Sequence, residues 1–193
     1  MFLKFFKFLF SGKKQKEKTI DSSIQPHLNI ELIDLTRPNF KASEFWRSTV
    51  AERNNIDNTP NQQYILSNLM QTADQMQILH SYLQSVYASN NVVIDITSGY
   101  RCEKLNVLVK GSPTSRHKSG LAVDIKVRVN KKILPLKVVM NHIIDAEINF
   151  DQILIENALN IIHIGFAINP LKARKQVKYA WIDKNNNWKT KKL

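Results

Sequence analysis

The 193-residue sequence contains a single cysteine, Cys102. One thiol cannot form an internal disulfide, and it rules out a zinc site built from several cysteines. Any metal would therefore be held by histidine and carboxylate side chains. No apolar run reaches the 18 residues that suggest a transmembrane helix. The apolar content of 43% is still sufficient for a hydrophobic core, and the length indicates one domain, with or without tails.

Acidic residues are scarce at both ends of the chain. Residues 1–20 contain six lysines and one glutamate, and residues 171–193 contain eight lysines or arginines and one aspartate. Residues 21–170 contain 14 basic and 14 acidic residues, and are therefore neutral. Basic arms attract polyanions such as nucleic acid, anionic lipid or wall polymers, although they can also serve only solubility. The neutral centre argues against a domain that reads nucleic acid.

This charge distribution predicts three parts. Residues 1–25 form a Phe/Lys-rich segment with a polar linker, residues 26–180 form the globular domain, and residues 181–193 form a basic tail. The first ten residues, MFLKFFKFLF, are too short to cross a bilayer. They fit a short amphipathic anchor at a membrane surface, or a poor signal peptide without a small-residue cleavage site before the lysine run.

Apolar periodicity and turn signals predict helices and strands in alternation. A short helix is expected from Ser43 as its N-cap, and a long helix is expected to follow a capping box formed by Thr59 and Gln62. The expected helices span 43–53, 60–87, 103–109 and 135–146, and the expected strands span 92–96, 124–129, 150–156 and 161–166.

One stretch, residues 112–124, carries both a histidine and an aspartate. His117 and Asp124 are seven residues apart, with Ser115 two residues before the histidine and Gly120 between them. An imidazole nitrogen and a carboxylate oxygen suit a borderline cation such as Zn²⁺, and glycine lets the backbone turn between them. The alternative is a polar loop whose Ser, His and Asp side chains only cap a turn.

A second histidine is expected on a β-hairpin formed by the strands 150–156 and 161–166. A four-residue loop places Glu156 opposite Ile161 and Leu154 opposite His163. Strand alternation then brings Gln152 to the same face. His163 and Glu156 thus provide a metal ligand with a nearby general base, unless His163 is simply a packed histidine.

An arginine follows the predicted strand 92–96. Gly99 allows the chain to leave the strand sharply, and Arg101 then presents a permanent cation with a bidentate fork. Such a group suits a substrate carboxylate or a developing oxyanion, and it equally suits a structural ion pair.

Taken together, these segments resemble the M15 zinc peptidases, in particular the phage and bacterial branch (type A of the family) related to D-alanyl-D-alanine carboxypeptidases and endolysins. The similarity covers about residues 40–180. The segments that carry it are Ser98-Gly99-Tyr100-Arg101, Leu105-Asn106, Ser115 to Asp124, Phe150 to Glu156 and Ile162-His163-Ile164, with Ser43-Glu44-Phe45, Ile56 to Pro60, Asn68-Leu69 and Ala173 to Val177 outside them.

The resemblance implies an α+β fold, with a small antiparallel sheet, flanking helices and a zinc site on the open face of the sheet (the M15/hedgehog-like peptidase fold). It implies His117, Asp124 and His163 as the Zn²⁺ ligands. Arg101 is expected to act in catalysis and to bind substrate. We also expect Ser115 and Gln152 to contact substrate.

The sequence departs from the family pattern at the expected base. Many M15 enzymes carry an acid three residues before the last histidine ligand, and Asn160 stands there. Asparagine cannot accept and return a proton, so either Glu156 is the catalytic base or catalysis is impaired. Cys102 replaces a usual serine, and Ile161-Ile162 stands where a tryptophan often precedes the histidine.

The resulting hypothesis is a zinc-dependent peptidase of peptidoglycan stem peptides, either a D,D-carboxypeptidase or an endopeptidase. It would act at the bacterial cell wall or in the periplasm, with the basic arms near an anionic wall or membrane surface. The alternatives are a catalytically impaired wall-binding or structural protein, and a nucleic-acid-binding protein that uses the arms. The oligomeric state is left open.

Overall fold

The computed structural model describes residues 37–185 and 187–193. The predictions for residues 1–25, including the membrane anchor at 1–10, lie outside these residues. Within the described ranges, no helix combines the length and the apolar character needed to span a bilayer.

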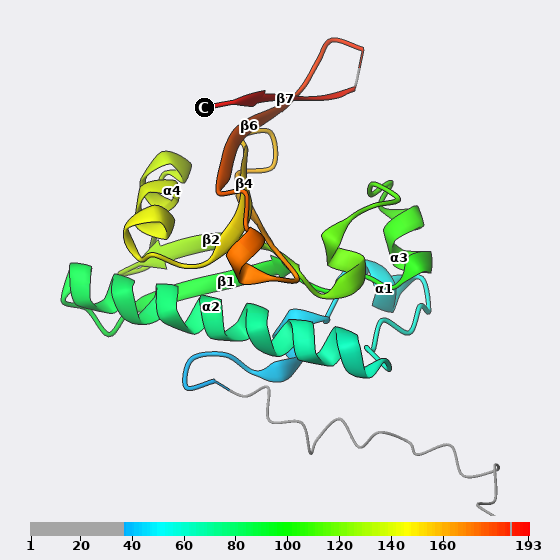
Figure 1. Ribbon diagram of the computed structural model, residues 1–193, viewed down its shortest axis with the longest axis horizontal. Helices are drawn as coiled ribbons and strands as arrows, with labels where there is room; N and C mark the ends of the chain where they lie inside the picture. The colour runs from blue at the N-terminus through cyan, green and yellow to red at the C-terminus, as the bar shows by residue number, and fades with distance from the viewer. Residues whose placement is uncertain (1–36, 186) are drawn as a thin grey trace, which may run out of the picture.

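The described chain is a mixed α+β domain, as predicted (Figure 1). The α-helices are α1 (Thr49–Arg53), α2 (Gln63–Tyr87), α3 (Glu103–Leu108) and α4 (Leu136–Asp145), and the short 3₁₀ helices are η2 (Ala42–Phe45), η3 (Arg116–Ser119) and η4 (Pro170–Lys172). The strands are β1 (Val92–Ser98), β2 (Ala122–Val129), β3 (Lys132–Ile133), β4 (Phe150–Glu156), β5 (Ile161–Phe166), β6 (Gln176–Ile182) and β7 (Trp188–Lys192).

All these strands belong to one sheet with the order β1-β2-β5-β4-β6-β7, and β3 pairs with β2. The expected antiparallel arrangement is wrong at one pair, because β6 runs parallel to β4. Both edges of β5 are already occupied by β2 and β4, and β5 ends beside the start of β4. The short connection through η4 cannot run back along the sheet, so β6 begins at the same end as β4.

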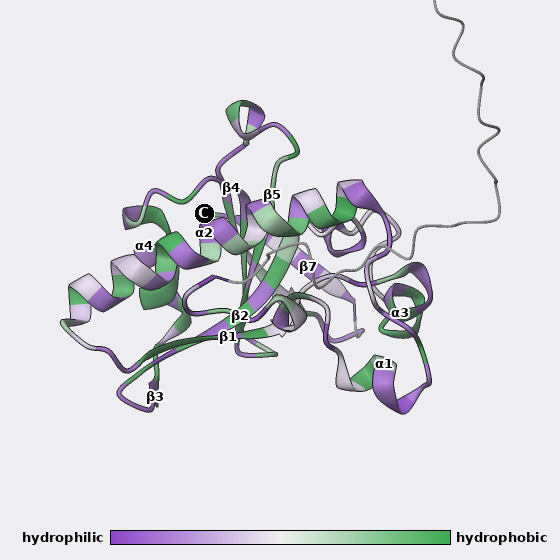
Figure 2. Ribbon diagram, turned by 90° about the horizontal axis from the view of Figure 1, so that it is seen from below, coloured by the Kyte–Doolittle hydropathy of each residue, from purple (hydrophilic) through white to green (hydrophobic). Residues whose placement is uncertain are grey.

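The two faces of the sheet differ in character. Val123 and Ile125 on β2 and Ile162 and Ile164 on β5 are buried on one face. Helix α2 packs on this face against β1 and β2, and α4 packs against β4 and β5 (Figure 1). In Figure 2, α2 shows apolar residues interrupted by polar ones, as expected of a helix with one buried side. The opposite face is free of these helices and carries Asp124.

Two predicted helix starts are wrong. The expected helix at 43–53 is divided into η2 and α1, because Ser48 caps α1 and its Oγ accepts the N–H of Ala51 at 3.3 Å. Helix α2 begins at Gln63 rather than at a Thr59 capping box. The N–H of Thr59 instead donates to Oδ1 of Asp57 at 2.9 Å, which stabilises a turn before the helix.

The charge of residues 181–193 predicted a separate basic tail, but these residues belong to the sheet. Ile182 pairs with Trp188 and Lys178 pairs with Lys192, so β6 and β7 form an antiparallel hairpin at the edge of the sheet. All five residues of β7 are exposed. Lysines suit this position, because charged side chains on an edge strand discourage pairing with another chain.

Candidate metal centre

His117, Asp124 and His163 converge on the open face of the sheet. Asp124 on β2 pairs directly with His163 on β5, and His117 lies on η3 just before β2. One potential ligand atom from each residue lies within 4.8 Å of the other two. Nδ1 of His163 is 2.8 Å from Oδ1 of Asp124, and Nε2 of His117 is 3.2 Å from the same oxygen.

The backbone around His117 fixes the direction of its ring. Oγ of Ser115 caps η3 and accepts the N–H of His117 at 3.4 Å. Gly120 ends η3 with a φ of 73°, a conformation that favours glycine. Nδ1 of His117 lies 2.6 Å from the carbonyl oxygen of Gly99. A carbonyl can only accept, so Nδ1 donates and Nε2 keeps a lone pair directed toward Asp124 and His163.

Gly99 is held in place by the segment before α1. A Cβ at Gly99 would lie 2.1 Å from the carbonyl oxygen of Phe45, so no larger residue fits without backbone movement. The buried side chain of Asn58 holds the residues that follow. Its Nδ2 donates to the carbonyl of Tyr100 at 2.9 Å, and its Oδ1 accepts the N–H of Cys102 at 2.7 Å. The turn between Gly99 and Cys102, which carries Arg101, is therefore fixed at both ends.

The carboxylate of Asp124 is shared between the two histidines and an arginine. Nη2 of Arg101 donates to Oδ2 of Asp124 at 2.9 Å, and Nε of Arg101 donates to Oγ of Ser98 at 2.9 Å. Burial acts to raise the pKa of Asp124, but His117 and His163 outweigh it and hold the pKa below its ordinary value. The carboxylate is therefore ionised. Burial lowers the pKa of His117 despite the nearby carboxylate, which favours the neutral ring that metal coordination requires.

This donor set suits a zinc ion. Nε2 of His117 and Nδ1 of His163 lie only 3.2 Å apart. Without a cation, lone pairs on these two nitrogens would face each other and the Asp124 carboxylate. A cation bound to both nitrogens would accept these lone pairs. Two imidazole nitrogens and one carboxylate oxygen are a set that Zn²⁺ accepts, and three protein ligands leave a position for water. The three residues could therefore hold Zn²⁺, with Arg101 compensating part of the carboxylate charge from outside.

A cavity of about 590 Å³ opens at this group. Every residue singled out for the site from the sequence lines it: Arg101, Ser115, His117, Asp124, Gln152, Glu156 and His163. Gln152 donates to Oε1 of Gln176 at 3.4 Å. The hairpin register that was predicted is also confirmed, with Glu156 opposite Ile161 and Leu154 opposite His163.

Glu156 and Asn160 differ in their surroundings. Glu156 is partly buried in the cavity wall, and its pKa is raised by burial and by the negative charge of Asp124. Asn160 is exposed in the turn between β4 and β5, with a φ of 51°, and is not among the residues that line the cavity. Asparagine tolerates this left-handed conformation better than most residues. The acidic side chain available in the cavity beside the histidines is therefore Glu156.

Several residues that shape the site were not recognised from the sequence. The buried carboxylate of Asp151 on β4 binds Nη2 of Arg116 at 2.8 Å and Nη2 of Arg174 at 2.6 Å. Arg116 also donates to the carbonyl oxygen of Phe166. Because Arg116 precedes His117 directly, this ion-pair group connects the metal centre to β4 and to the start of β6. No local pattern links residues so distant in the chain.

Residues of the β6–β7 hairpin were also missed as part of the site. Ala180, Trp188 and Thr190 line the same cavity as His163. The sequence predicted a tail here because lysines dominate the composition of residues 181–193. Strand β7 has only five residues, which is too short for a clear alternation of apolar and polar side chains.

The comparison with protein families agrees with this geometry. A model of the Peptidase M15 family matches residues 38–165, about two thirds of the chain and all three of the converging residues. The chain belongs to the Peptidase M15 family, and is therefore a metallopeptidase by class. M15 peptidases depend on zinc, which the His/Asp/His group could hold. No curated protein matches the chain significantly.

Proposed function

We propose that this protein is a zinc-dependent peptidase of peptidoglycan stem peptides. The observation that carries the proposal is the convergence of His117, Asp124 and His163 within 4.8 Å, in a cavity that also contains Glu156 and Arg101. Family membership supports the reaction class. The substrate class rests on the charge of the cavity.

In such an enzyme, zinc lowers the pKa of a bound water toward about 7 and polarises the scissile carbonyl. His117, Asp124 and His163 would hold this ion, with the two histidines using the nitrogens that face Asp124. The Nδ1–H bond from His117 to Gly99 orients the ring and strengthens it as a ligand.

Glu156 is the general base in this proposal. Its carboxylate takes the proton of the attacking water and returns it to the nitrogen of the leaving amine. A raised pKa suits both steps, because the group must be ionised to accept the proton and must then hold it until the amine leaves. Glu156 lies one diagonal step from His163 across the hairpin, a spacing of about 7–8 Å between backbone positions.

Arg101 has a separate task. Its guanidinium already donates to Asp124 and Ser98 and lines the cavity. The remaining N–H groups can donate to the carbonyl oxygen as negative charge develops there, or to the terminal carboxylate of the substrate. Ser115 and Gln152 also line the cavity and are the proposed additional contacts to the peptide backbone.

The cavity has the charge of a site for acidic peptides. Arg101, Lys110, Arg116 and Arg174 line it, and the acidic residues among its lining are Asp124 and Glu156. The buried carboxylate of Asp151 offsets part of the charge of Arg116 and Arg174, so the positive charge exceeds the negative charge only slightly before zinc binds. Bound zinc would make the cavity still more positive. Stem peptides of peptidoglycan carry several free carboxylates, so they match this charge. Cleavage would take place at the cell wall, where the basic N-terminal segment would hold the enzyme near an anionic surface in a salt-dependent manner.

A specific observation supports the second candidate, a zinc-binding wall protein without turnover. Asn160 stands where many M15 enzymes have an acid, and it cannot transfer a proton. In that case zinc would bind with one ion per chain and stem peptides would bind uncut.

The test is digestion of purified muropeptides followed by mass analysis, with and without a chelator. The proposal expects a loss of one D-alanine for a carboxypeptidase, or two peptide fragments for an endopeptidase. It also expects no cleavage product when the chelator is present or when the His163→Ala variant is used. Intact muropeptides in every reaction, with zinc bound to the wild type, would favour the second candidate.

A further inference from the structure

The β6–β7 hairpin forms one wall of the cavity although it lies outside the family match. The match ends at residue 165, and the hairpin spans Gln176–Lys192. Ala180, Trp188 and Thr190 of this hairpin nevertheless line the cavity together with His163. The part of the chain that matches the family therefore contains the converging ligands, and a segment added beyond it completes their surroundings.

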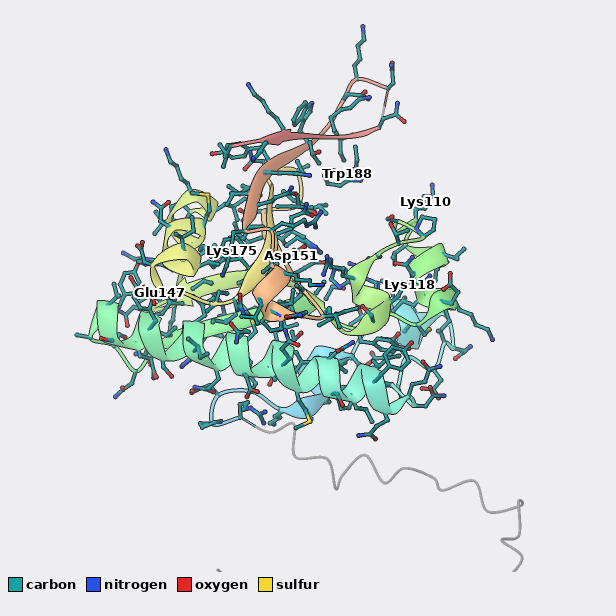
Figure 3. The ribbon with its side chains drawn as sticks, in the orientation of Figure 1. Lys110, Lys118, Glu147, Asp151, Lys175 and Trp188 are labelled. Atoms are coloured by element: carbon teal, nitrogen blue, oxygen red, sulfur yellow. The ribbon has the colours of Figure 1, made fainter. Side chains whose placement is uncertain are left out.

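The strand register explains why the hairpin reaches the site. Glu156 on β4 pairs with Ala180 on β6, and Ala180 pairs with Thr190 on β7. Paired residues direct their side chains to the same face of a sheet, and so do residues two apart on one strand. Trp188, two residues before Thr190, therefore shares the face that carries Glu156. Figure 3 shows Trp188 below the ribbon of β7, across from Lys110, and both residues line the cavity.

The hairpin contains two tryptophans with different surroundings. Trp188 is 49% exposed and Trp181 is 43% exposed. Trp181 pairs with Lys189, so it lies on the opposite face from Trp188, and it is not among the residues that line the cavity. A large apolar ring left half exposed in a cavity wall, beside the polar groups of the site, is available for a ligand rather than for the core.

The distance from the metal centre defines what Trp188 would contact. β7 is three strands away from β5, which is about 14 Å at about 4.8 Å per strand. Trp188 also lies four residues along β7 from Lys192, which shares the row of His163, and this adds about 13 Å along the strand. In the plane of the sheet Trp188 is therefore about 19 Å from His163. Four residues of an extended peptide cover about 13 Å of this distance, so the group that reaches Trp188 is the one attached beyond the fourth residue from the scissile bond. In a peptidoglycan stem cut near its carboxyl end, the group attached beyond the fourth residue is the sugar that carries the stem.

We propose that Trp188 is a substrate-positioning residue that packs against the sugar ring at the base of the stem peptide. This inference rests on the proposed function, and it deepens that function by assigning the β6–β7 hairpin to substrate selection. An indole face packs well against the C–H groups of a pyranose ring, while Thr190 beside it offers a hydroxyl. Lys110 lines the same cavity and adds positive charge for the acidic stem.

The experiment compares two probes, a disaccharide-pentapeptide muropeptide and the same pentapeptide without sugars. Wild type, Trp188→Ala, Trp188→Phe and Trp181→Ala are assayed with both. The expected KM of the wild type is about tenfold lower for the muropeptide, an effect of the size of one aromatic contact. Trp188→Ala should remove this preference without changing kcat, Trp188→Phe should restore most of it, and Trp181→Ala should retain it.

An equal KM for both probes in the wild type, or a preference that survives in Trp188→Ala, would overturn the inference while leaving the peptidase function intact. If the wild type cleaves neither probe, the peptidase function is wrong, and titration calorimetry with the same two probes tests the hairpin independently. Tighter binding of the muropeptide that is lost in Trp188→Ala supports the inference, and equal binding of the two probes by the wild type refutes it.

Discussion

Replacing Asp151 by asparagine should destabilise the protein far more than the same change at a second Asp–Arg pair. The Asp151 side chain is only 2% exposed, and it accepts bonds from the N–H, Nε and Nη2 of Arg174 and from Nη2 of Arg116. Asparagine keeps one acceptor oxygen and has no charge, so two arginines would face each other without a carboxylate between them. Breaking a buried ion pair costs about 3–5 kcal/mol.

The expected cost lies at or just below the lower limit of that range. The arginine side chains are 34% and 49% exposed, so water recovers part of the lost interaction. We therefore expect Asp151→Asn to lower the free energy of unfolding by about 2–3 kcal/mol. The matched control is Asp95→Asn on the open face, where Arg128 also makes a bidentate pair at 2.6 and 2.7 Å but both side chains are over a third exposed. This change should have a much smaller effect than Asp151→Asn, because water screens an exposed ion pair.

Urea unfolding of the zinc-free protein at pH 7 measures both values. Arg116 and Arg174 hold the pKa of Asp151 below its ordinary value although burial opposes them. The stabilisation is therefore complete above the unfolded-state pKa of about 3.9 and is lost as the pH falls through the lower folded-state pKa. Asp151→Asn should accordingly lose less stability than the wild type below about pH 4. Equal costs for the two asparagine variants would refute the role of the buried ion-pair group.

Three further predictions concern the residues around the histidines. Glu156→Gln should lower kcat about 10²–10⁴-fold, because an amide cannot transfer the proton, and it should leave the zinc content unchanged. A normal kcat in steady-state kinetics would exclude Glu156 as the base. Arg101→Lys should lower kcat about 10²–10³-fold, because an ammonium group cannot donate to Ser98, Asp124 and substrate in the same geometry. A variant with normal kcat and a lower free energy of unfolding would show that the role of Arg101 is structural. Gly99→Ala should cost about 1–3 kcal/mol in urea unfolding, because the new Cβ would collide with the carbonyl of Phe45, and an unchanged midpoint would contradict this.

Local patterns in the sequence were sufficient to predict the hairpin that carries Glu156 and His163. The alternation in 150–156 and 161–166 placed Leu154 opposite His163, as the structure has it. The loop length of four residues fixes that register, so no distant contact is needed to find it. The long amphipathic helix up to Tyr87 was equally clear, because nine of its residues are buried at helical spacing.

Features that depend on distant partners could not be predicted. The parallel pairing of β6 with β4 follows from which sheet edges remain free, and that is known only once β5 is placed between its neighbours. The start of α2 depends on the Asp57 turn competing with the Thr59 capping box. Asp151 gives no local sign that it binds two arginines, because its partners are 35 residues before it and 23 residues after it. The position of Trp188 in the cavity wall was also not predicted, because lysines dominate the sequence around it.

The central claim is that His117, Asp124 and His163 bind one zinc ion, and metal analysis of dialysed protein tests it most directly. The account predicts one zinc per chain in the wild type and in His142→Ala, whose ring lies on α4 and binds the hydroxyl of Tyr87 at 2.9 Å. It predicts substoichiometric zinc in His163→Ala. Wild-type protein without zinc, or His163→Ala with a full equivalent, would contradict it.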